Sequence, residues 1–164
     1  MARDKIMLGL VGITSVSAVA LGQVSQHVFD MAPCAWCVFQ RLIYLSLGLV
    51  CAAGSLGHPT RLRTAVSAAV ATALGISGVL AAWYQVQVAA NMFSCKQTLA
   101  DQVITTLRLD EMMPWLFGIY ATCMEAKVKV LGVEYGVWSL SLFVILGLTS
   151  MAALICATRG HRGQ

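Results

Sequence analysis

Charged side chains are scarce in this chain. They make up 11% of its 164 residues, whereas 59% of the residues are hydrophobic. A soluble domain carries about 25% charged residues, so a molecule surrounded by water fits this composition poorly. Glycine-rich phosphate loops, internal repeats and low-complexity tracts are also absent from the sequence. We therefore expect a membrane protein, and nothing in the sequence indicates a nucleic-acid partner.

The few charges are unevenly placed, and the gaps between them predict four membrane helices. Four stretches contain no Asp, Glu, Lys or Arg: 6–29, 42–60, 64–95 and 135–158. Each stretch supplies the roughly 20 residues, or a few fewer, that an α-helix needs to cross a bilayer. We place the spans near residues 6–24, 41–57, 65–84 and 137–157. The third is rich in small residues, which let helices approach closely. The sequence thus predicts an all-α integral membrane four-helix bundle, formed by one domain over residues 1–164.

The remaining charges differ between the two sides of this predicted bundle. The side with both termini and the turn at 57–63 has a net charge of +5, and the side with loops 25–40 and 85–136 has a net charge of −1. Basic residues near membrane ends mark the cytoplasmic side. We therefore expect both termini in the cytoplasm and the two loops on the outer side.

The first span also has some features of a cleaved signal peptide. It has a basic start, an apolar stretch and then Ala18-Val19-Ala20, which resembles a cleavage site. The apolar run is longer than a typical signal core and continues past that point. We therefore favour a retained helix.

The predicted topology divides the six cysteines into two groups. Cys51 and Cys156 fall inside spans two and four, where buried thiols usually act as small hydrophobic side chains. The other four share the outer face, in a compartment that permits disulfides. They are Cys34, Cys37, Cys95 and Cys123.

The residues alone leave three interpretations of the outer cysteines open. Two structural disulfides are possible, although a ring as small as Cys34–Cys37 locks little chain entropy. A four-cysteine zinc site usually needs two CxxC knuckles, but Cys95 and Cys123 are 28 positions apart, so we expect no metal. The third interpretation is a thiol–disulfide relay between the two pairs.

The segment from Pro33 to Arg41 favours the relay. Pro33 suits the start of a helix, whose N-terminal dipole would stabilise a thiolate in the cysteine pair that follows. Residues 34, 37 and 41 share one helical face, so we expect Arg41 one turn deeper than Cys37. An arginine at membrane depth is a functional candidate, although it could also snorkel to the interface. Its guanidinium could stabilise the Cys37 thiolate and donate hydrogen bonds to a carbonyl-bearing acceptor.

With these residues in view, the chain resembles the disulfide bond formation protein B (DsbB) family. The likeness covers essentially the whole chain in topology. The motifs that carry it are, in order, Cys34-x-x-Cys37-x-x-Gln40-Arg41, Cys95, Pro114, Cys123-x-Glu125 and Leu131-Gly132 leading to Trp138. CxxC alone would be a weak signal, whereas this ordered combination is specific.

The resemblance implies a quinone-dependent membrane thiol oxidase of the bacterial inner membrane, with loops 25–40 and 85–136 in the periplasm. In that family a periplasmic dithiol oxidase of the thioredoxin fold (DsbA) delivers electrons to the second-loop disulfide. By position this disulfide is Cys95–Cys123, and Cys95 would form the mixed disulfide with the partner. Cys123 would then exchange with Cys34, and Cys37 would pass the electrons to a bound quinone. The sequence leaves ubiquinone and menaquinone equally open.

Two further site residues follow from the resemblance. Arg41 matches the quinone-assisting arginine of the family, and Gln40 beside it is another quinone-binding candidate. The sequence also departs from the family pattern. The Arg-His pair that is common near the outer end of span three is missing, since residues 81–85 read Ala-Ala-Trp-Tyr-Gln, and Thr122 stands where an acidic residue is common. The three histidines of the chain are expected to be solvated or interfacial.

Two other functions stay open at this point. The protein could be a relative dedicated to one particular partner or substrate. It could also be a non-enzymatic four-span scaffold whose outer disulfides are structural. Quinone reduction by the purified protein with a reduced thioredoxin-fold partner separates these functions from the general oxidase.

Overall fold

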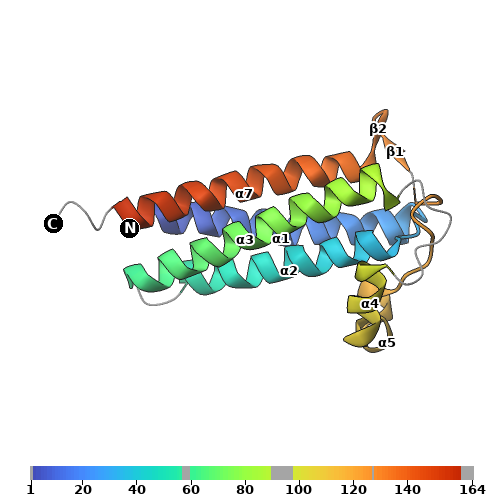
Figure 1. Cartoon of the computed structure of the whole chain (residues 1–164), viewed down its shortest axis with the longest axis horizontal. Helices are drawn as coiled ribbons and strands as arrows, with labels where there is room; N and C mark the ends of the chain where they lie inside the picture. The colour runs from blue at the N-terminus through green and yellow to red at the C-terminus, as the bar shows by residue number, and fades with distance from the viewer. Residues whose placement is uncertain (1, 57–59, 90–97, 127, 160–164) are drawn as a thin grey trace.

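Four long helices run side by side in the computed structural model, which describes residues 2–56, 60–89, 98–126 and 128–159. They are α1 (Ala2–Val28), α2 (Ala35–Leu56), α3 (Arg61–Gln87) and α7 (Tyr135–Arg159) (Figure 1). All four are long and apolar enough to cross a membrane. The structure therefore confirms the predicted all-α four-helix membrane bundle.

The helices do not end where the apolar stretches end. α1, α3 and α7 extend past the expected spans at both ends, because a helix can continue through polar residues once it has left the lipid. α2 begins at Ala35, well ahead of the expected start at 41. Its first turn forms at the CxxC segment, where the Cys34 carbonyl accepts the Val38 N–H at 3.0 Å. This early start places both cysteines of the motif on the rim of the bundle.

Small residues set the close contact between α3 and α7, which share the most extensive helix interface. A Cβ added to Gly75 of α3 would lie 2.8 Å from the Cα of Gly147 in α7, so the two backbones approach as closely as glycine allows. One turn further along α3, Gly78 leaves the space that the ring of Phe143 fills. The small residues of span three therefore act as a packing surface, as small residues do in membrane helices.

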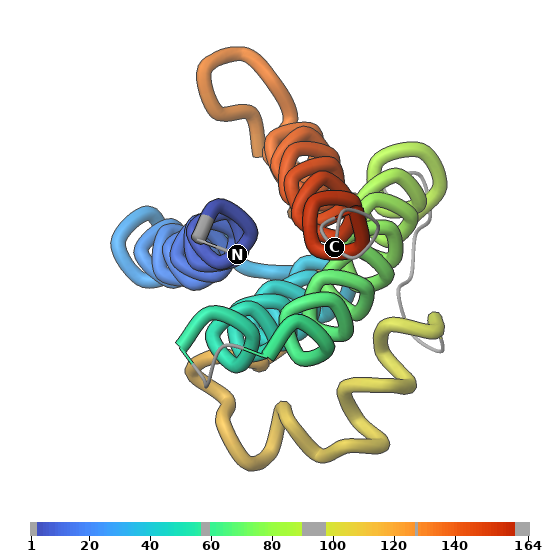
Figure 2. Tube along the Cα trace, turned by 90° about the vertical axis from the view of Figure 1, so that its left-hand side faces the viewer, coloured from blue at the N-terminus to red at the C-terminus, as the bar shows by residue number. Residues whose placement is uncertain are grey.

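The four helices form a ring, and the contacts between neighbouring helices differ in extent. α2 packs against both α1 and α3, and α7 packs against α3, whereas the contact between α1 and α7 is less extensive. Figure 2, which looks along the bundle, shows α1 and α7 on adjacent sides of the ring. The less extensive contact between α1 and α7 matters for the site, because a cavity opens there.

The remaining elements gather at one end of the bundle, opposite the start of α1 and the end of α7 (Figure 1). Three of them are the short helices α4 (Leu99–Thr106), α5 (Leu109–Met112) and α6 (Pro114–Phe117). The others are β1 (Lys129–Val130) and β2 (Val133–Glu134), which form an antiparallel hairpin. Its two turn residues, Leu131 and Gly132, have φ angles of 54° and 81°, as a tight two-residue hairpin turn requires.

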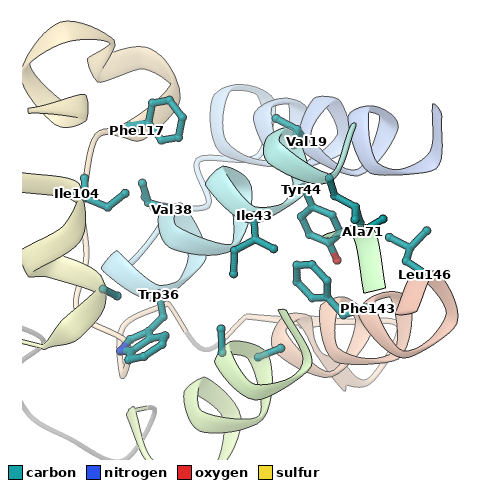
Figure 3. Close-up of a cluster of buried hydrophobic side chains, with 14 of the residues drawn as sticks. Val19, Trp36, Val38, Ile43, Tyr44, Ala71, Ile104, Phe117, Phe143 and Leu146 are labelled. Atoms are coloured by element: carbon teal, nitrogen blue, oxygen red, sulfur yellow. The ribbon is translucent and has the colours of Figure 1, made fainter. Parts of the chain in front are cut away.

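Apolar packing fixes this cap to the bundle. Ile104 of α4 and Phe117 of α6 converge with Val38 in the first turns of α2 (Figure 3), and all three are at most 2% exposed. Deeper in the bundle, Tyr44 of α2 stacks on Phe143 of α7 with ring centroids 4.0 Å apart. The start of α2 is therefore held from both the cap and the bundle, and it carries the CxxC motif.

Candidate functional site

The CxxC cysteines lie together at the start of α2. Their sulfur atoms are 3.3 Å apart, close enough for a disulfide to form with little movement. Cys34 is fully buried, whereas Cys37 is partly exposed. The pair thus has one sulfur inside the protein and one at an accessible surface.

Cys123 joins this pair from the second loop. The Pro33 carbonyl accepts the N–H groups of Tyr120 and Ala121 at 3.1 and 3.3 Å, which ties the chain before Cys123 to the chain before Cys34. The Cys123 side chain, only 3% exposed, forms a hydrogen bond with Cys34. Three of the four predicted redox cysteines therefore meet, with Cys34 in the middle. The fourth, Cys95, lies outside the described residues.

This contact changes the acidity of Cys34. The hydrogen bond with Cys123 is the largest cause that raises the pKa of the Cys34 thiol from its ordinary 9.0 to about 12, and burial adds to it, while the contact with Cys37 acts in the opposite direction. The dithiol arrangement therefore keeps the proton on Cys34. A sulfur that holds its proton is a poor nucleophile but remains a target for attack once it is part of a disulfide.

Thr122 and Glu125 brace the turn that carries Cys123. A Glu125 carboxylate oxygen accepts both the backbone N–H and the hydroxyl of Thr122 at 2.9 Å, and the Thr122 hydroxyl accepts the Glu125 N–H at 3.3 Å. This reciprocal pattern is that of a capping box. The backbone hydrogen bond from Thr122 is the main cause that lowers the pKa of Glu125. The residue that departs from the family pattern, Thr122, thus has a structural role beside Cys123.

Arg41 lies one turn after Cys37 and joins three elements. One guanidinium nitrogen donates to the Gln26 side-chain oxygen at 2.7 Å and to the Leu116 carbonyl at 2.9 Å, and the other donates to the Gly22 carbonyl at 3.3 Å. These acceptors belong to α1 and α6, and Arg41 is only 8% exposed. The side chain is therefore held within the protein, where it ties the second loop to the helices.

Gln40 takes part in a polar chain inside the bundle. Its amide oxygen accepts the Ser139 hydroxyl of α7 at 2.7 Å, and its amide nitrogen donates to the amide oxygen of Gln85 in α3. Gln85 in turn donates to the Cys37 sulfur at 3.1 Å. No sequence motif indicated a role for Gln85, which belongs to the stretch at 81–85 that lacks histidine. A polar residue near the outer end of an apolar span was the one available signal.

A cavity of about 520 Å³ lies beside these residues, between α1, α2 and α7. Cys37, Gln40 and Arg41 all line it, so the three neighbours in the motif share one space. Leu21 of α1 and Ile145 of α7 also line it, and both are at least 60% exposed on the outside of the bundle. Because these helices span the membrane, the cavity is reached from the lipid.

The other two cysteines lie away from this site. Cys51 is fully buried in α2, where it packs against Gly12 of α1. Cys156, near the end of α7, accepts a hydrogen bond from Arg3 at 3.5 Å. Within the part of the chain that the structure describes, no group of three or more His, Cys, Asp and Glu side chains is placed to hold a metal ion.

Comparison with known proteins now decides the family. The model of the family described as disulfide bond formation protein DsbB matches residues 4–153 of this chain. The chain belongs to the DsbB family. This membership, together with the four apolar helices, makes it a disulfide-forming oxidoreductase that spans the bacterial inner membrane several times. It exchanges disulfides with a periplasmic partner.

Individual DsbB relatives match most of the chain. Disulfide bond formation protein B 2 of Pseudomonas aeruginosa is 34% identical over 138 residues, which cover 82% of this chain and 80% of the relative. Disulfide bond formation protein B of Ralstonia nicotianae is 28% identical over 155 residues, covering 94% and 96%. Disulfide bond formation protein B 1 of Pseudomonas syringae is 29% identical over 161 residues, covering 98% and 93%. The likeness to DsbB proteins therefore covers nearly the whole chain.

Proposed function

We propose that this DsbB protein is a quinone-dependent thiol oxidase that re-oxidises a periplasmic thioredoxin-fold dithiol oxidase of the DsbA type. One observation carries the proposal. Cys34 contacts Cys123 on one side and Cys37 on the other, and Cys37 also lines a cavity that is reached from the lipid. Electrons that arrive at the second loop thus have a path of adjacent sulfurs to a lipid-dissolved acceptor.

The first step is exchange with the partner. A thiolate of the reduced partner attacks Cys95 of a Cys95–Cys123 disulfide, forms a mixed disulfide there and releases Cys123 as a thiolate. The part of Cys95 rests on its position in the sequence. The described contacts support the next transfer, because Cys123 lies against Cys34 before any large movement of the loop.

The second step is exchange within the protein. The Cys123 thiolate attacks Cys34 of a Cys34–Cys37 disulfide, so that a Cys34–Cys123 bond forms, the Cys34–Cys37 bond breaks and its electron pair leaves on Cys37. Cys34 is the sulfur that Cys123 contacts, whereas Cys37 faces the cavity. These contacts support attack on Cys34 and departure of Cys37.

The cavity suits a quinone headgroup. Its volume falls in the range of about 300–1,000 Å³ that is typical of small-molecule sites. Its walls are largely apolar, as a planar ring with a polyprenyl tail requires, and the Arg41 guanidinium on its wall offers N–H donors for a ring oxygen. A bound quinone would supply the acceptor for two electrons and two protons. Arg41 would favour negative charge near Cys37, and Gln40 would form part of the same wall.

The decisive experiment is quinone reduction by purified protein with a reduced thioredoxin-fold partner. We expect Cys37→Ser to reduce the rate to the uncatalysed level, because the sulfur that delivers the electrons is gone. Cys156→Ser serves as the matched control, since Cys156 lies near the far end of α7, and it should keep the full rate. Intact quinone reduction in Cys37→Ser would refute the proposed function.

The same assay tests how general the enzyme is. We expect several reduced thioredoxin-fold oxidases to support quinone reduction, because the general type serves a whole compartment. Oxidation of a single partner alone would instead favour a dedicated DsbB relative. If the protein kept its full activity after all four outer cysteines were replaced, every version of this mechanism would be contradicted.

A further inference from the structure

We propose that Gln85 is a further catalytic residue, whose amide N–H stabilises the thiolate that forms on Cys37, and that Tyr44, Ser139 and Gln40 hold this amide in its donating orientation. The inference deepens the proposed function and rests on it, since it concerns the sulfur that leaves during the internal exchange. It assigns a role to a residue for which the motifs of the sequence gave none.

The contacts of Gln85 define its orientation. Its amide nitrogen lies 3.1 Å from the Cys37 sulfur and 3.8 Å from the Cys34 sulfur. Its amide oxygen accepts a hydrogen bond from the amide nitrogen of Gln40. The side chain is only 8% exposed, so water does not compete strongly for either end. Gln85 therefore directs an amide N–H toward the CxxC sulfurs, and its amide oxygen points away from them.

The residues behind Gln85 enforce this orientation. Ser139 donates its only hydroxyl proton to the Gln40 oxygen at 2.7 Å, which leaves the Gln40 nitrogen to face Gln85. The Tyr44 hydroxyl lies 3.1 Å from the Ser139 hydroxyl and 3.3 Å from the Ser139 carbonyl oxygen. Tyr44 is the donor to both oxygens, which share its one proton, because the Ser139 proton is already used. Every hydrogen bond from Tyr44 to Cys37 thus points the same way. Aligned hydrogen bonds polarise one another, so the chain strengthens the last donor.

This direction matches the charge that the reaction creates. When Cys123 attacks Cys34, one negative charge moves from the Cys123 sulfur to the Cys37 sulfur as the Cys34–Cys37 bond breaks. An N–H aimed at Cys37 interacts more strongly with that thiolate than with a disulfide sulfur. The stabilisation therefore appears as the bond breaks, which is the condition for lowering a barrier rather than only binding a reactant.

Arg41 does not supply this hydrogen bond, because it directs its guanidinium N–H groups to oxygen atoms. Its described hydrogen bonds go to the oxygens of Gln26, Leu116 and Gly22. Within the described residues, the Cys37 sulfur accepts its side-chain N–H from Gln85. Arg41 supplies a positive charge nearby, and Gln85 supplies the directed hydrogen bond.

The test separates donation to the sulfur from support of Gln40. Gln85→Glu keeps the length and shape of the side chain and an oxygen that accepts from Gln40, but it removes the N–H that faces Cys37. A hydrogen bond to a charged atom is worth about tenfold or more in the thiolate population. Because a more basic thiolate is also more nucleophilic, the alkylation rate of Cys37 should fall by about three- to fourfold for each tenfold loss of thiolate. The rate is measured on the reduced protein at neutral pH with iodoacetamide and mass spectrometry.

Gln87→Glu is the matched control. It places the same substitution two residues later on α3, at an exposed position, and should leave the alkylation rate unchanged. Gln85→Met removes the donor without adding a charge, and Tyr44→Phe removes the first donor of the chain while keeping the ring. Both should slow Cys37 alkylation, with the smaller effect in Tyr44→Phe, so the inference stays testable if Gln85→Glu does not fold.

The outcomes distinguish this inference from the proposed function. If Cys37→Ser abolishes quinone reduction and Gln85→Glu slows both alkylation and turnover, both hold. If Gln85→Glu and Gln85→Met match Gln87→Glu in both measurements while Cys37→Ser is inactive, the role of Gln85 is wrong and the proposed function stands. If Cys37→Ser keeps full activity, the proposed function fails, and the alkylation rates then show whether Gln85 acts on the sulfur at all.

Discussion

Cys34 is the residue on which the two cysteine pairs converge. Its thiol is fully buried and hydrogen-bonded to Cys123, and its pKa is raised to about 12. The folded protein therefore favours the protonated thiol. The stability that this form contributes is fully present below the ordinary thiol pKa of 9.0 and is lost as the pH rises through about 12.

A prediction for the reduced protein follows from this raised pKa. At pH 9.0, where an ordinary thiol is half ionised, we expect Cys34 to stay almost entirely protonated and to alkylate slowly. Cys123→Ala removes the largest cause of the shift, so alkylation of Cys34 should begin at lower pH in that variant. Mass spectrometry of the protein alkylated over a pH series measures both. Equal pH profiles of Cys34 alkylation in the two proteins would show that Cys123 does not raise the Cys34 pKa.

At the scale of single residues, sequence motifs indicated the four outer cysteines and Arg41 as candidate site residues. They could not predict Gln85, because a Gln near the end of an apolar span carries no motif that separates it from a neighbour such as Gln87. The position of Gln85 matters only because α3 places it opposite the first turn of α2. The partners of Arg41 were equally out of reach, since Leu116 lies 75 positions away in the chain.

At the scale of the helices, the interface between α3 and α7 depends on glycine. A side chain at Gly75 would meet the backbone of Gly147, and a backbone cannot move aside as a flexible side chain can. The two helices would then have to separate. Because Gln85 and Ser139 sit on these same helices, the polar chain that ends at Cys37 depends on their spacing.

Gly75→Leu should therefore destabilise the bundle by at least the roughly 1–3 kcal/mol that overpacking typically costs. Ala73→Leu, two residues earlier on the exposed side of α3, is the matched control and should change stability little. Thermal unfolding in detergent, followed by circular dichroism, compares the two variants with the unchanged protein. Equal midpoints for all three would contradict the tight α3–α7 contact.

The small elements of the cap show why the second loop was harder to predict than the spans. α4, α5 and α6 are short, and their apolar residues fit both a membrane surface and a bundle surface. In the structure α4 buries Ala100 and Ile104 against the bundle, whereas Leu99 and Leu107 of the same segment are more than half exposed. The same apolar segment thus serves packing on one face and remains uncovered on the other.

At the scale of the whole molecule, the orientation in the membrane remains a prediction with a direct test. α1 begins and α7 ends at the same end of the bundle, and the cap lies at the other (Figure 1). The excess of basic residues on the first side favours the cytoplasm there. In a chain without its six native cysteines, we expect Leu131→Cys at the hairpin tip to react with a membrane-impermeant maleimide added to spheroplasts. Arg63→Cys should react only after lysis, and the reverse pattern would invert the topology.

Composition and the spacing of charges along the chain were sufficient for the four-helix membrane fold, because lipid solvation acts on each segment separately. The family followed from the resemblance of the ordered motifs. Sequence did not predict the contact between Cys34 and Cys123, the hydrogen bonds of Arg41 to α1 and α6, or the hydrogen-bond chain from Tyr44 to Cys37. Those features join segments that are distant in sequence, and their energies exist only after α1, α2, α3, α7 and the cap have packed.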